Sequence, residues 1–70
     1  MIDHKEIERA LPILRYFKYD HIPSERLRAI SAPFCALAYQ LAEEVPASAE
    51  LVAGLRKLLE AKDCAVRAAL

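Results

Sequence analysis

Several features that define other protein classes are scarce in this chain of 70 residues. It has one glycine, and its ten basic residues are balanced by ten acidic ones. One glycine cannot supply a glycine-rich phosphate loop. A net charge of zero disfavours non-specific binding to duplex DNA, which needs an excess of basic residues. It still allows a small anionic ligand, which needs only a few local cations.

Long apolar runs are also missing. No stretch approaches the roughly 18 apolar residues that span a bilayer, and residues 1–9, with their several charges, are unlike a signal peptide. We therefore expect a cytoplasmic protein with no membrane partner.

Metal-binding and catalytic residues are few and poorly spaced. His4 and His21 are far apart, and neither has a cysteine at ligand spacing, so no metal site is predicted. In an antiparallel helix pair, Cys35 and Cys64 would be offset by about 9 Å along the helix axis. This exceeds the limit of about 7 Å for a disulfide, so we expect free thiols. No nucleophile has a base and an orienting third group, which predicts a protein that is not an enzyme and needs no cofactor.

The residues that are abundant favour an all-α fold. Hydrophobic residues make up 56% of the chain, and alanine, leucine and charged residues dominate. Apolar side chains recur every three or four residues in two long segments, which predicts helices over about 24–45 and 48–69. Ser24 and Ser48 are the expected N-caps. Because residues 45–48 form a short connection, the two helices should form an antiparallel hairpin.

Residues 1–18 are predicted to form a short N-terminal helix, so that residues 1–70 make one small domain with the hairpin over 24–70. Asp3 is its expected N-cap, and Ile7, Leu11 and Leu14 form its apolar edge. Pro12 should kink or restart this helix. With so little to bury, the segment is expected to pack on a neighbouring chain or to stay mobile. A chain this short cannot cover all its apolar surface alone, so a homo-oligomer is expected.

The segment 15–23 combines aromatic and basic side chains. It holds three of the five aromatic residues of the chain, next to Arg15, Lys18 and His21. Aromatic faces stack on nucleobases and cations bind phosphates, so this mixture suits a nucleotide ligand. The alternative is that Tyr16 and Phe17 are packing residues at the end of the first helix.

A series of motifs is similar to the hairpin domain of the small bacteriophage proteins that act as anti-CBASS and anti-Thoeris cyclic-nucleotide sponges. The resemblance covers roughly residues 17–69. Its motifs, in order, are Phe17-x-Tyr19, His21, Pro23, Leu37-Ala38, Val45-Pro46, Glu50 and Leu55-x-Lys57-Leu58-x-Glu60-Ala61. Their order and spacing are more specific than any one of them.

The resemblance implies a non-catalytic immune-evasion protein that sequesters cyclic di- or oligonucleotides in pockets between protomers, typically of a hexamer. By resemblance Tyr19 stacks on a base, and cations contributed across an interface meet phosphates. The implied ligand-binding residues are Phe17, Tyr19, His21, Arg28, Lys57 and Arg67. Family members often have Trp-Ala-Asn where this chain has Cys64-Ala65-Val66. A different interpretation is a small helical adaptor that contacts a host protein through its apolar face and binds no small ligand.

Overall fold

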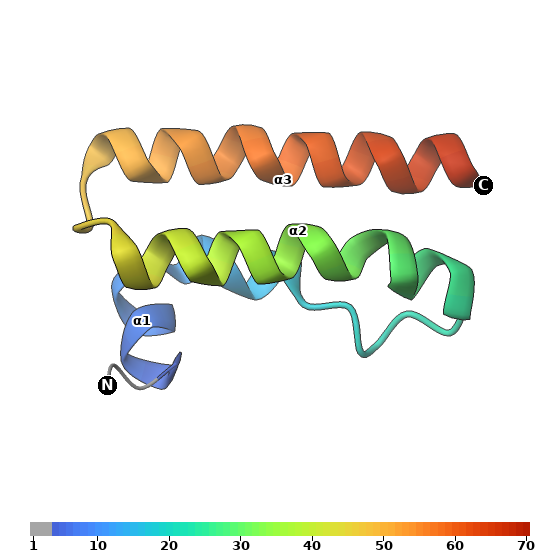
Figure 1. Cartoon of the computed structure of the whole chain (residues 1–70), viewed down its shortest axis with the longest axis horizontal. Helices are drawn as coiled ribbons and strands as arrows, with labels where there is room; N and C mark the ends of the chain where they lie inside the picture. The colour runs from blue at the N-terminus through green and yellow to red at the C-terminus, as the bar shows by residue number, and fades with distance from the viewer. Residues whose placement is uncertain (1–3) are drawn as a thin grey trace.

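The computed structural model describes residues 4–70, and every regular element in this range is helical. The elements are α1 (His4–Ala10), the 3₁₀ helix η1 (Pro12–Phe17), α2 (Glu25–Glu44) and α3 (Ala49–Ala69) (Figure 1). The expected all-α fold is confirmed. The proposed cap at Asp3 lies outside the described residues.

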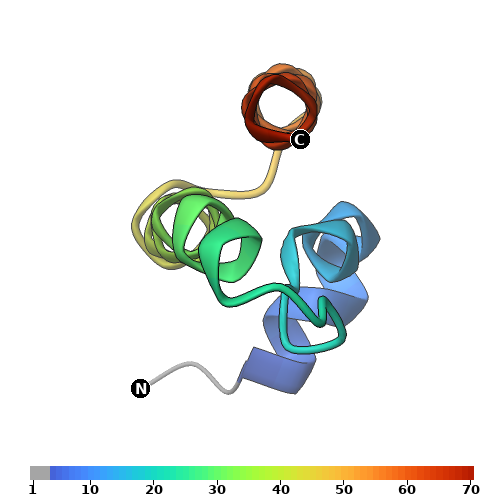
Figure 2. The same ribbon diagram turned by 90° about the vertical axis from the view of Figure 1, so that its right-hand side faces the viewer.

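The two long helices form the predicted antiparallel hairpin. Figure 1 shows α2 and α3 side by side, with the short connection at one end. In the end-on view of Figure 2, η1 lies beside α2, and α3 lies above both. Both α2 and α3 contact η1, so the core forms where these three helices meet.

Local capping accounts for the ends of the hairpin helices. Ser24 Oγ accepts a hydrogen bond from the Leu27 amide at 3.3 Å, and Ser48 Oγ accepts one from the Leu51 amide at 3.1 Å. Each serine satisfies a donor that the first helical turn leaves unpaired. Both predicted N-caps are confirmed, and α2 continues through Pro33 as one helix.

Apolar residues of segment 4–17 are buried within their own chain, whereas the sequence suggested that this segment would cover a neighbouring chain or stay mobile. The α-helix ends at Ala10, and the chain restarts at Pro12 as a 3₁₀ helix. A 3₁₀ helix has three residues per turn, so Leu11, Leu14 and Phe17 lie on one edge of it. These three side chains are at most 3% exposed, and Ile7 joins them at 5%.

The apolar stripe of α2 (Leu27, Ile30, Phe34, Leu37, Leu41 and Val45) faces the core only in part: Phe34 and Leu41 pack against it. The fully buried residues of α2 are Ser31 and Ala38, whose small side chains allow η1 and α3 to approach closely. Leu37 and Val45, which belong to the stripe, are 42% and 40% exposed. On α3, by contrast, Leu51 and Leu55 of the predicted stripe are buried.

Candidate functional site

Four concave surfaces of the described residues are relevant to binding. The acidic hollow is lined mainly by Glu6, Ile7, Ala10, Leu11, Ala42, Glu43, Glu44, Val45, Pro46 and Ala47. The cationic cup is lined by Lys5, Glu8, Arg9, Pro12 and Arg15. The aromatic pocket is lined by His4, Lys18, Tyr19, Ala32, Cys35, Ala36 and Tyr39. The apolar groove is lined by Leu41, Val45, Ser48, Glu50, Leu51, Gly54, Leu55, Lys57, Leu58 and Ala61.

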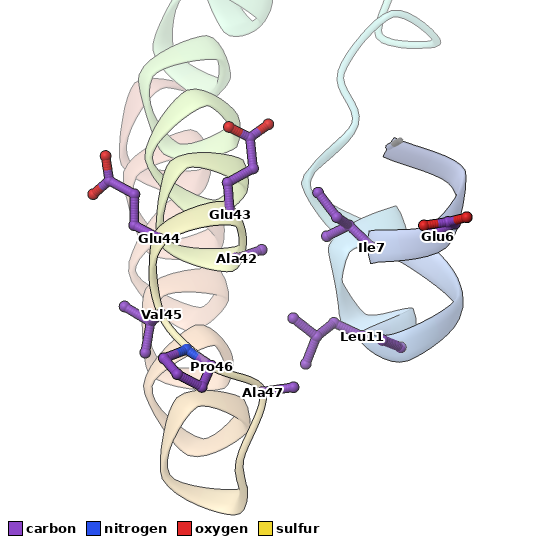
Figure 3. Close-up of a pocket in the computed structure, with 10 residues that line it drawn as sticks. Glu6, Ile7, Leu11, Ala42, Glu43, Glu44, Val45, Pro46 and Ala47 are labelled. Carbon is purple, nitrogen blue, oxygen red and sulfur yellow. The ribbon is translucent and has the colours of Figure 1, made fainter. Parts of the chain in front are cut away.

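The acidic hollow, of about 340 Å³, lies between the N-terminal segment and the end of α2. Figure 3 shows Ile7 and Leu11 projecting toward α2 and the connection that follows it. The charged residues that line it are Glu6, Glu43 and Glu44, with no cation among them. Like charges repel, so this hollow is unsuited to an anionic ligand.

The aromatic pocket, of about 350 Å³, brings three parts of the chain together. His4 comes from α1, Lys18 and Tyr19 follow η1, and Tyr39 comes from α2. The rings of His4 and Tyr39 are in contact, with centroids 4.9 Å apart, and His4 Nε2 lies 3.0 Å from Glu43 Oε1. Ligand pockets have volumes of roughly 300–1,000 Å³, so this pocket is large enough for a nucleobase.

Glu8 connects the aromatic pocket to the cationic cup. Its Oε1 accepts a hydrogen bond from the Tyr39 hydroxyl at 2.8 Å and lies 2.9 Å from Lys18 Nζ. The hydrogen bonds from Lys18 and then from Tyr39 lower the pKa of Glu8, and the bond to Glu8 raises the pKa of Lys18. Burial, followed by the bond to Glu8, raises the pKa of Tyr39, so its hydroxyl remains a hydrogen-bond donor at neutral pH.

Acidification is expected to destabilise the contact between α1 and α2 by protonating Glu8. Because folding lowers the pKa of Glu8, its stabilising contribution is fully present above the ordinary value of 4.5 and is lost as the pH falls through the lower, folded-state pKa. The melting temperature of the wild type should therefore fall more steeply below pH 4.5 than that of Glu8→Gln. Glu60→Gln, on an exposed part of α3, is the control and should follow the wild type. Identical pH profiles for Glu8→Gln and the wild type would contradict the prediction.

The Glu8 carboxylate also lines the cationic cup. Three cationic residues, Lys5, Arg9 and Arg15, line this cup of about 500 Å³ together with Glu8. The neighbouring ammonium of Lys18 offsets the charge of Glu8, which leaves the cup with a net positive charge. Arginine and lysine are the residues that bind phosphate groups most strongly.

Phe17 is the one predicted ligand-binding residue that the structure contradicts. Its side chain is 0% exposed and lies in the core with Leu14 and Leu55. A fully buried ring cannot stack on a ligand while the domain stays folded, so the packing alternative is right for Phe17. The adjacent Tyr16 is 66% exposed and is not a core residue.

Tyr19 lines the aromatic pocket. His21 and Arg28, the predicted ligand-binding residues that follow Tyr19 in the chain, do not line it. His21 is exposed, in a turn that the hydrogen bond from the Ile22 amide to the Tyr19 carbonyl closes. Arg28 lies one turn before Ala32 on the same face of α2. Its guanidinium donates to the Ile22 carbonyl and so holds the connection onto α2.

Lys57 and Arg67 are both on α3, and neither lines the aromatic pocket. Lys57 lines the apolar groove, and Arg67 donates a hydrogen bond to Cys64 Sγ at 3.4 Å near the end of the helix. Leu41 of the groove follows Tyr39 of the pocket by two residues, which is about 200° around α2. The groove and the aromatic pocket therefore lie on opposite sides of α2, and the chain does not bring Lys57 and Tyr19 together.

Sequence reasoning missed Tyr39 and the residues of α1. His4 and Glu8 are four residues apart, as are Lys5 and Arg9, so each pair shares a face of α1. From that spacing, the sequence could have predicted that His4 and Glu8 lie on one face of α1 and that the cations Lys5 and Arg9 lie on another. The contact with Tyr39 has no signal in the sequence, because it joins residues 31 positions apart.

Both cysteines are free, as predicted. Cys35 lines the aromatic pocket, and burial raises the pKa of its thiol, which is the reverse of what activates a nucleophile. Among residues 4–70, no three histidine, cysteine or acidic side chains form a group that could hold a metal ion. Within the same range, no helix combines the length and apolarity needed to cross a bilayer.

Comparisons of this chain with protein-family models, with curated proteins and with solved structures find no match.

Proposed function

We propose that this chain is a non-catalytic protein that binds and sequesters cyclic di- or oligonucleotides. One observation carries the proposal: the aromatic pocket and the cationic cup meet at Glu8, which lines the cup and bonds to two residues of the pocket. A cyclic nucleotide carries flat bases joined by phosphates, so it requires both surfaces side by side. With the sponge resemblance, this supports a phage immune-evasion role in the host cytoplasm, by removal of a nucleotide signal of host defence.

Each surface supplies a different part of the recognition. Tyr19 and Tyr39 offer aromatic faces on which a base can stack. The guanidinium groups of Arg9 and Arg15 can bind phosphate oxygens in pairs. Lys18 offsets the charge of Glu8 between the two surfaces, which reduces the repulsion that a phosphate would meet there.

In this proposal the ligand lies between copies of a homo-oligomer, a hexamer by resemblance. The aromatic pocket is open on one side, and neither Lys57 nor Arg67 is among the residues that line it within the same chain. A neighbouring copy would both close the pocket and add cations to it. This would exclude water and strengthen the contacts with phosphate.

Calorimetric titration with a panel of cyclic di- and trinucleotides tests the proposal directly. At least one member should bind, and Tyr19→Ala should weaken it by about 1–3 kcal/mol, the usual range for one base–aromatic stack. Tyr16→Ala is the matched control, because it removes an exposed tyrosine that lies outside the pocket. No binding by any member of the panel, or equal losses for the two variants, would contradict the proposal.

Recovery of the nucleotide distinguishes sequestration from catalysis. After incubation with excess protein and denaturation, chromatography should return the bound nucleotide intact and in full. A chemically altered product would instead show that the chain is an enzyme.

A further inference from the structure

The apolar groove has a volume of about 560 Å³ and belongs to none of the sites assigned above. Its walls come from α2 and α3, and most of the side chains that line it are apolar. Val45 at its edge is 40% exposed. The groove lies on the opposite side of α2 from the aromatic pocket, so the proposed nucleotide site does not use it.

Gly54 forms part of the groove wall, and no packing contact within its own chain requires a glycine there. It is the one glycine of the sequence and lies in the middle of α3, where glycine weakens a helix relative to alanine. A Cβ atom added at this position would meet no atom within 4 Å. The missing side chain therefore serves no internal packing, but it allows another backbone to approach α3 closely.

The charged residues that line the groove are one acid and one base, on either side of Gly54. Glu50 precedes Gly54 by four residues and Lys57 follows it by three. Two such helices packed antiparallel about Gly54 would place position 50 of one level with position 58 of the other. Glu50 would then be within one residue, about 1.5 Å along the axis, of Lys57 on the second helix.

We propose that a second copy of this chain fills the groove, with the two α3 helices packed antiparallel about a two-fold axis at Gly54. In this arrangement the two-fold axis produces the Glu50–Lys57 pair twice. Parallel packing in the same register would instead place Glu50 level with Glu50 and Lys57 level with Lys57. The apolar residues supply the contact area, and the charges select the orientation. The inference rests on the homo-oligomeric part of the proposed function, and it assigns Lys57 to a carboxylate of the second copy instead of to the nucleotide.

Light scattering coupled to size-exclusion chromatography tests the interface without any nucleotide. The wild type should elute as a dimer or a larger even-numbered assembly at micromolar to millimolar concentration. Gly54→Leu should shift it to smaller species, because the side chain blocks the close approach. Leucine is the better helix former, so this variant is expected to keep its fold.

Charge reversal tests the orientation. Glu50→Lys and Lys57→Glu should each raise the dissociation constant of the dimer at least tenfold, because each change opposes like charges twice. The double variant E50K/K57E should restore the wild-type constant. Glu60→Lys reverses a charge of α3 outside the groove and should have no such effect.

A wild-type monomer at high concentration would overturn the inference, and so would assembly that Gly54→Leu leaves unchanged. Either result would mean that a second copy of this chain does not occupy the groove. Nucleotide binding is measured separately, so the two proposals fail separately. A dimer that binds no cyclic nucleotide supports the interface and contradicts the proposed ligand. A monomer that binds one contradicts the interface and the placement of the ligand between copies, and supports only the ligand itself.

Discussion

A chain that begins at Lys18 is expected to show no cooperative thermal unfolding as a monomer. The deletion removes Ile7, Leu11, Leu14 and Phe17, which are four of the seven buried hydrophobic residues among those the structure describes. Burial of one large apolar side chain contributes roughly 1.5–3 kcal/mol, so the loss is about 6–12 kcal/mol at most. Whole domains are stable by only about 5–15 kcal/mol. The hairpin of α2 and α3 should therefore not be an independent folding unit.

Circular dichroism melting of the shortened chain provides the measurement. Addition of a synthetic peptide of residues 1–17 should restore part of the cooperative transition, because the peptide returns the missing half of the core. A sharp, concentration-independent transition of the shortened chain alone would show that the N-terminal segment is dispensable.

Phe17→Ala is expected to cost about 3–5 kcal/mol of unfolding free energy, the usual range for removing a buried phenylalanine. The ring is 0% exposed at the end of η1, in the cluster formed with α2 and α3. Truncation leaves a cavity between three elements, which the surrounding helices can fill only in part. A loss of this size approaches the whole stability of a small domain.

Tyr16→Ala is the matched control, since it truncates the adjacent aromatic residue, which is 66% exposed. The carbonyl of Tyr16 accepts a hydrogen bond from Lys62 Nζ at 2.8 Å, and alanine retains this carbonyl. Urea unfolding should therefore place Tyr16→Ala within about 0.5 kcal/mol of the wild type. Similar losses for the two variants would refute the assignment of Phe17 to the core.

The site was predictable only in part. The sequence singled out the segment that contains Lys18 and Tyr19, because aromatic and basic residues are adjacent there. It gave no sign that Tyr39 and His4 complete the same pocket, since the bonds Tyr39–Glu8 and His4–Glu43 span 31 and 39 residues. Proximity of that kind depends on how the helices pack, which no local pattern encodes.

The sequence by itself determined where the two long helices begin and end. Ser24 and Ser48 cap them, and Pro46 separates them; these are effects of neighbouring residues on the backbone, so they act before any tertiary contact forms. Only the tertiary structure decided that η1 is a 3₁₀ helix and that the small residues of α2 face the core. A 3₁₀ turn has poorer hydrogen-bond geometry than an α-helical turn. It is stable here because it aligns Leu11, Leu14 and Phe17 against α2 and α3, and that gain exists only once both helices are in place.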